Sequence, residues 1–213
     1  MGFLKRKRHV NSYKDGNYCL QMIIDNYDVG NSERHAILER VLTEAQKYND
    51  SLHILACAYA CHFSTAEYRK KAINYFELYL QNPQAVNFPQ FSLSQIYSDL
   101  GKDYEAEHNF IDAERSYSLS IQNHEPRHYS SLTEQWDIFP QEIMLGRLYL
   151  KISTQKAVDY WKGLMEREEY KTGDPDSAGF RRSVDVEYKN ASVKHEKGYV
   201  FRPRKTAKQE EKQ

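Results

Sequence analysis

The sequence predicts an all-α protein built from antiparallel pairs of helices. Apolar residues recur every three or four positions over most of the chain, which is the period of an amphipathic helix. The predicted helices are 12–18 residues long and come in pairs, and little strand-like alternation occurs before residue 183. A chain of 213 residues with 40% hydrophobic residues can bury roughly 70% of its unfolded surface, so a folded core is expected.

Three helices are predicted in the first half of the chain, beginning at Ser32, at about Leu52 and at Ala66. Ser32 is the expected N-cap of the first, and Glu33 lies in its first turn. The third ends at Asn82-Pro83, because proline cannot continue a helix and disfavours helical geometry in the residue before it. Residues 18–27 favour a helix over a strand, although the Ile23-Ile24 doublet leaves their period ambiguous.

Two further pairs are predicted in the second half: Phe91–Glu107 with Phe110–Asn123, and Gln141–Ile152 with Thr154–Glu169. Pro126 follows the first pair and Pro140 precedes the second. Since proline interrupts a helix, the segment between the two pairs is expected not to continue either helix. The pairing of neighbouring helices predicts stacked helical hairpins.

The first of these two pairs carries a recurring motif of small and aromatic residues. It reads Tyr97-x2-Leu100-Gly101-x2-Tyr104, followed by Ala113-x3-Tyr117 and by Pro126. This pattern resembles the tetratricopeptide repeat. The resemblance implies a solenoid in which the small Gly101 and Ala113 let two helices cross closely, while the aromatic rings fill the space between hairpins.

Two flanking segments look like divergent copies of this motif. They are Leu55-Ala56-x2-Tyr59 with Ala72-x3-Phe76, and Leu145-Gly146-x2-Tyr149 with Ala157-x3-Trp161. The alanines at 72, 113 and 157 are 41 and 44 residues apart, whereas the family repeats every 34. The resemblance therefore covers about residues 50–170 and predicts an irregular, tetratricopeptide-like solenoid.

The resemblance also implies a function and a set of binding residues. First-helix side chains around the consensus glycine contact an extended peptide or a partner helix in this family. The corresponding partner-binding groove here comprises His53, Cys57, Gln95, Ser98, Lys102, Ile143 and Arg147. A non-catalytic protein-interaction adaptor or scaffold is the implied function. The Lys and Asn set that clamps a carboxyl terminus in some members is not reproduced.

The balanced net charge hides two basic ends on an acidic body. Residues 1–14 carry 5 basic and no acidic side chains, residues 15–188 carry 17 and 27, and residues 189–213 carry 8 and 3. The predicted organisation is a basic tail at 1–14, a repeat domain at 15–170 and a basic extension at 171–213. The basic residues singled out are Lys5, Arg6, Lys7, Arg8, Arg202, Arg204 and Lys205. They support an alternative function, a nucleic-acid or ribonucleoprotein accessory factor.

The C-terminal extension breaks the helical pattern. Val184 to Tyr188 alternates between apolar and polar residues, and Tyr199-Val200-Phe201 favours extended backbone. The sequence therefore predicts a short irregular or β-hairpin extension.

Catalytic and metal-binding patterns are weak, and the chain is predicted to be neither an enzyme nor a cofactor or metal protein. His124-Glu125-Pro126-Arg127-His128 matches the HExxH pattern of zinc hydrolases, but Pro126 prevents both histidines from sharing one helical face. A zinc hydrolase stays as a third function class. His53, Cys57 and Cys61 form one stripe, yet three such positions span about 12 Å, too far for a single ion.

A cytoplasmic location is expected. Three cysteines are too few for a secreted disulfide framework, and Met1 to His9 lacks the apolar segment of a signal peptide. No apolar run approaches the length of a membrane span, so no membrane partner is expected. Homo-oligomerisation through an exposed end hairpin stays open.

Overall fold

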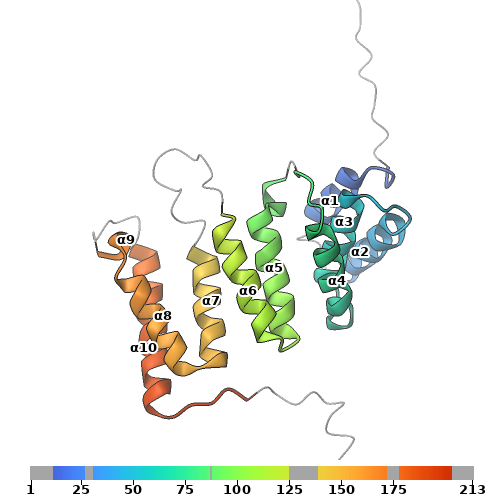
Figure 1. The fold of residues 1–213 in the computed structure, drawn as a ribbon. Coiled ribbons are helices and arrows are strands. Elements are labelled where there is room, and N and C mark those ends of the chain that lie inside the picture. The colour runs from blue at the N-terminus through green and yellow to red at the C-terminus, as the bar shows by residue number, and fades with distance from the viewer. Residues whose placement is uncertain (1–11, 27–30, 87, 125–138, 172–177, 203–213) are drawn as a thin grey trace, which may run out of the picture. The chain divides into compact units, whose positions relative to one another are not determined.

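The computed structural model describes residues 12–26, 31–86, 88–124, 139–171 and 178–202, and Figure 1 shows their arrangement in helices. The helices are α1 (Gly16–Asp25), α2 (Asn31–Ala45), α3 (Ser51–His62), α4 (Arg69–Leu80), α5 (Leu93–Ala106), α6 (Phe110–Gln122), α7 (Phe139–Ile152), α8 (Thr154–Met165), α9 (Glu168–Lys171) and α10 (Ala178–Glu196). Short 3-10 turns cover Ala66–Tyr68 and Pro89–Phe91. No strand occurs in the described ranges, which confirms the all-α prediction for them.

The chain divides into two compact units, the first ending at Ser92 and the second beginning at Leu93. In the first unit, α3 is the central helix and packs against α1, α2 and α4. Its sequence from Leu55 to Cys61 is apolar on every side and is buried throughout. Small residues let the neighbours approach: a Cβ added to Gly16 would lie 2.5 Å from the Cβ of Leu52.

Side chains cap several helix starts. Asp15, Asp50, Asn109 and Ser153 each accept a hydrogen bond from a backbone N–H of the first turn, in α1, α3, α6 and α8 respectively. Ser32 does not serve as the predicted N-cap, because α2 begins one residue earlier at Asn31. Asp50, the cap of α3, also binds the buried side chain of His53.

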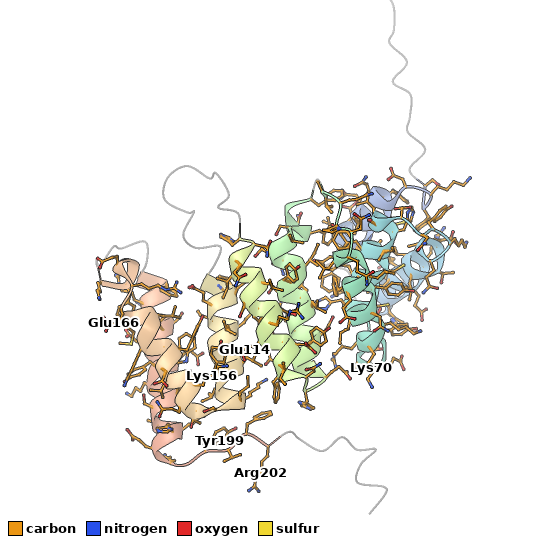
Figure 2. The ribbon with its side chains drawn as sticks, in the orientation of Figure 1. Lys70, Glu114, Lys156, Glu166, Tyr199 and Arg202 are labelled. Carbon is orange, nitrogen blue, oxygen red and sulfur yellow. The ribbon has the colours of Figure 1, made fainter. Side chains whose placement is uncertain are left out.

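The second unit contains two hairpins, α5 with α6 and α7 with α8, and α10 packs along α8 and contacts α7. Glu114 of α6 and Lys156 of α8, labelled in Figure 2, form an ion pair of 2.6 Å. The hydroxyl of Tyr149 on α7 donates a 3.1 Å hydrogen bond to the same Glu114 carboxylate. Polar contacts thus link the three consecutive helices α6, α7 and α8.

The predicted β-hairpin in the C-terminal extension is wrong. Val184 to Tyr188 lies inside α10, where Phe180, Val184 and Ala191 form the buried face. Their spacing of four and seven residues is helical, and it extends over a longer segment than the five-residue alternation that suggested a strand. Val186, which alternation would pair with Val184, is 61% exposed.

None of the described helices has the length and apolar character needed to span a membrane.

Candidate functional site

Two side-chain contacts link the helices α5, α7 and α10 of the second unit, and we call the accessible side chains of these three helices the first-helix face. The Oγ of Ser98 on α5 lies 3.9 Å from the Sδ of Met144 on α7. Further along, the Nε of Arg147 on α7 donates a 2.6 Å hydrogen bond to Glu187 on α10. These two contacts join α5 to α7 and α7 to α10.

Four of the predicted groove residues, Gln95, Lys102, Ile143 and Arg147, retain accessible surface on this face. Gln95 and Lys102 both donate to the carboxylate of Asp99, at 3.0 Å and 2.7 Å. Asp99 itself is buried. The side chain of Lys102 is 41% exposed and that of Arg147 is 62% exposed, so both cations reach solvent.

The other three predicted groove residues, His53, Cys57 and Ser98, are buried to 2% exposure. Ser98 is covered where α5 and α7 approach each other. His53 and Cys57 belong to α3, which neighbouring helices surround in the first unit. These three side chains cannot touch a bound partner without local opening of the fold, so their assignment to an accessible groove is corrected.

His53 instead holds the first unit together. Its Nε2 lies 3.0 Å from the carbonyl oxygen of Tyr13, and its Nδ1 lies 2.5 Å from the carboxylate of Asp50. A carbonyl oxygen and a carboxylate oxygen only accept, so Nε2–H donates in the first contact and Nδ1–H donates in the second. The ring also stacks on Tyr48, with centroids 4.5 Å apart. The imidazole therefore joins the segment before α1 to the start of α3.

The three cysteines are free thiols inside the first unit. Burial raises the pKa of Cys19 to about 11 and that of Cys57 to about 12. Such thiols are poor nucleophiles and poor metal ligands at neutral pH, because the thiolate is the reactive form. In the part of the chain that the structure describes, no group of three or more His, Cys, Asp or Glu side chains is arranged to hold a metal ion.

A pocket of about 310 Å³ opens beside the first-helix face. Arg147, Leu150 and Lys151 of α7 line one side, and Glu187, Asn190 and Lys194 of α10 line another. Tyr199 and Phe201 from residues 197–202, here called the C-terminal strap, complete the lining. Of this set, sequence reasoning had selected only Arg147. Residues 187, 190 and 194 have the spacing of one helical face. This spacing could have identified them if the segment had been predicted as a helix and not as a β-hairpin.

The strap is held by specific contacts after α10 ends. Gly198 has a φ of 63°, and the N–H groups of Gly198 and Tyr199 donate to the carbonyls of the last helical turn. The Lys194 ammonium lies 5.1 Å from the Tyr199 ring centroid. Phe201 then reaches Phe110, with ring centroids 5.9 Å apart. The strap is thus an ordered wall of the pocket.

Several predicted residues lie outside the described ranges. These are Glu125 to His128 of the HExxH match, and the tail cations Lys5, Arg6, Lys7, Arg8, Arg204 and Lys205. Arg202 is described and is exposed at the end of the strap.

Comparison of the chain with protein-family models, with curated proteins and with solved structures finds no match. The residues of the first-helix face and of the pocket therefore carry the functional proposal by themselves.

Proposed function

We propose that this protein is a non-catalytic, tetratricopeptide-like adaptor that binds an extended peptide or partner helix on the first-helix face. The observation that carries the proposal is the linkage of α5 to α7 and of α7 to α10, through Ser98 with Met144 and Arg147 with Glu187. First helices of successive hairpins form the binding surface in the family that the sequence resembles. Here the first helices of two successive hairpins, α5 and α7, present Lys102 and Arg147 to solvent.

The packing inside the hairpins supports a tetratricopeptide-like arrangement. Gly101 of α5 faces the ring of Tyr117 on α6, and Gly146 of α7 faces the ring of Trp161 on α8. The same small-to-aromatic pairing thus occurs at matching motif positions of both hairpins. A surface built on packed helices is largely formed before binding, which lowers the ordering cost that a partner must overcome.

The chemistry of the face suits a polar segment of a partner. Gln95 offers an amide, Lys102 an ammonium and Arg147 a guanidinium, and each of these groups donates hydrogen bonds. Ile143 of α7 is partly accessible and offers apolar contact. An extended peptide, whose carbonyls point to both sides, can accept such bonds along its length.

The test requires a partner and two matched double variants. A partner is first identified by cross-linking in the native cell and then produced in pure form. Lys102→Ala with Arg147→Ala removes two cations from the first-helix face. Arg115→Ala with Lys162→Ala removes two exposed cations from the second helices α6 and α8. We expect the first variant to weaken the affinity at least about tenfold, in the range of interface hot spots, and the second to leave it unchanged.

Equal affinities of both variants, measured by titration calorimetry on proteins with unchanged circular dichroism, would contradict the proposed face. The alternative function through the basic termini has a different signature. Nucleic acid recovered only at low salt, and lost when residues 203–213 are removed, would favour the accessory-factor function, because phosphate contacts weaken steeply with salt.

A further inference from the structure

We propose that the pocket between α7, α10 and the C-terminal strap binds an acidic side chain of the partner, with a neighbouring apolar side chain of the same peptide against its aromatic wall. This inference rests on the proposed function and names the chemistry of the partner. Three cations, Arg147, Lys151 and Lys194, line the pocket against one carboxylate, Glu187. The lining therefore attracts an anion.

Hydrogen-bond donors are available on two of these cations. Within the described part of the chain, Arg147 pairs with Glu187 through Nε. The two terminal nitrogens of the guanidinium can then donate two parallel hydrogen bonds to another carboxylate. The Lys194 ammonium contacts the face of the Tyr199 ring, and an ammonium has three N–H donors. A carboxylate between Arg147 and Lys194 would receive charge-assisted hydrogen bonds from both.

The apolar part of the pocket is formed mainly by the strap. Leu150 of α7 and the rings of Tyr199 and Phe201 stand beside the cations. Phe201 is fixed by Phe110 and by the Lys151 ammonium, which lies 5.6 Å from its ring centroid. At about 310 Å³ the pocket is at the small end of ligand sites, which suits one or two side chains of a peptide.

Carboxylates around the pocket favour a peptide over a nucleic acid. Glu187 lies in the lining, and Glu105 pairs with Lys151 at 2.5 Å. A row of phosphates would meet both carboxylates as well as the cations, whereas a single acidic side chain needs only the space between Arg147 and Lys194. The arrangement of charges therefore favours a single carboxylate side chain over a row of phosphates.

The test uses the full chain and two fluorescein-labelled octapeptides, one with Glu and Leu at alternating positions and one with Gln in place of each Glu. The pocket variant is Arg147→Gln with Lys194→Gln. The matched control, Arg182→Gln with Lys189→Gln, changes two exposed cations of α10 that do not line the pocket. Fluorescence anisotropy and circular dichroism are measured for each protein.

We expect the intact chain and the control to bind the Glu peptide at least tenfold more tightly than the Gln peptide, and the pocket variant to lose this preference. Phe201→Ala is expected to weaken binding of the Glu peptide as well. Absence of binding by the Glu peptide, equal binding of both peptides, or an undiminished preference in the pocket variant would overturn the inference. Tighter, pocket-dependent binding of an eight-nucleotide single strand would assign the pocket to nucleic acid instead.

Failure of this inference is distinguishable from failure of the proposed function. Arg147 belongs both to the first-helix face and to the pocket, so the deciding variant is Lys194→Gln with Phe201→Ala. If the partner's affinity falls with Lys102→Ala but not with this variant, the pocket inference is wrong and the proposed function stands. If neither variant changes the affinity, both are wrong.

Discussion

The indole ring of Trp161 occupies the space that a side chain on residue 146 would need. A Cβ added to Gly146 would overlap ring atoms Cζ2, Cη2 and Cε2 of Trp161. Gly101 and Tyr117 repeat the relationship, with a Cβ on residue 101 only 2.7 Å from the tyrosine ring. In both hairpins, an aromatic ring of the second helix packs directly on the backbone of the first.

Gly146→Ala is therefore expected to destabilise the second unit. The added methyl forces the buried Trp161 out of place, and overpacking of this kind costs about 1–3 kcal/mol. The free energy of unfolding is measured by urea titration with circular dichroism.

Gly163→Ala in α8 is the matched control, because nothing lies within 4 Å of a Cβ at that position. Alanine is the better helix former, so this variant should gain about 0.5–1 kcal/mol. Glycine to alanine is thus expected to lower the free energy of unfolding at position 146 and to raise it at position 163. A neutral or stabilising Gly146→Ala would contradict the packing described for Trp161.

A second prediction concerns Glu142 at the start of α7, whose side chain is only 1% exposed and is paired with Arg167. Arg167→Ala removes this cation from a buried carboxylate, and we expect a loss of about 2 kcal/mol, reduced from that of a fully buried pair because the arginine is 44% exposed.

Combining Arg167→Ala with Glu142→Gln should recover most of that loss, since the neutral amide no longer needs the cation. Thermal unfolding of the single and double variants measures the coupling. If the double variant is as unstable as Arg167→Ala, the ion pair is not the reason for the cost.

A third prediction follows from the buried thiols. Because burial raises the pKa of Cys19 and Cys57, and all three cysteines are covered, less than one thiol per chain should react with Ellman's reagent within minutes at pH 8. All three should react after unfolding in guanidinium chloride. Ser32→Cys, at an exposed position of α2, is the positive control and should react at once. Rapid reaction of a native cysteine would contradict the described core.

Much of the fold could be predicted from helical periodicity and from the small-to-aromatic motif. The motif around Gly101 predicted a close crossing of two helices, and Gly101 of α5 does pack on the ring of Tyr117 on α6. That ring was predicted to fill the space between hairpins, and it instead packs inside its own hairpin. The sequence did not predict α10, because the alternation of apolar and polar residues from Val184 to Tyr188 suggested a strand. The buried helical face from Phe180 to Ala191 is recognisable only once the helix is known. Short alternation and helical period compete in such a segment.

The candidate site was predictable only in part. Lys102 and Arg147, selected by their offsets from a consensus glycine, have accessible side chains, and their role in binding stays a prediction. The same offsets failed for His53 and Cys57, because whether a helix position is covered depends on its neighbours, and α3 is surrounded by three helices. The pocket could not be foreseen, since the strap reaches Phe110 across more than 80 residues of sequence.

The last prediction concerns pH and the contact between Asp50 and His53. Partial burial raises the pKa of Asp50, but hydrogen bonds from the ring and the backbone N–H of His53 outweigh it, so the pKa is lowered from 3.8. A lowered pKa means that the folded state stabilises the carboxylate. The stabilisation is fully present above pH 3.8 and is lost as the pH falls through the lower value of the folded protein.

Asp50→Asn removes this charge and keeps an oxygen that can cap α3, so the variant should be less stable than the natural protein at pH 6. The difference in melting temperature should shrink as the pH is lowered from 5 to 2.5, because protonation removes the same charge from the natural protein. Asp25→Asn, at an exposed carboxylate of α1, is measured alongside it to account for the general effect of removing a charge. A stability difference for Asp50→Asn that is independent of pH would contradict the assignment of this stabilisation to the charge of Asp50.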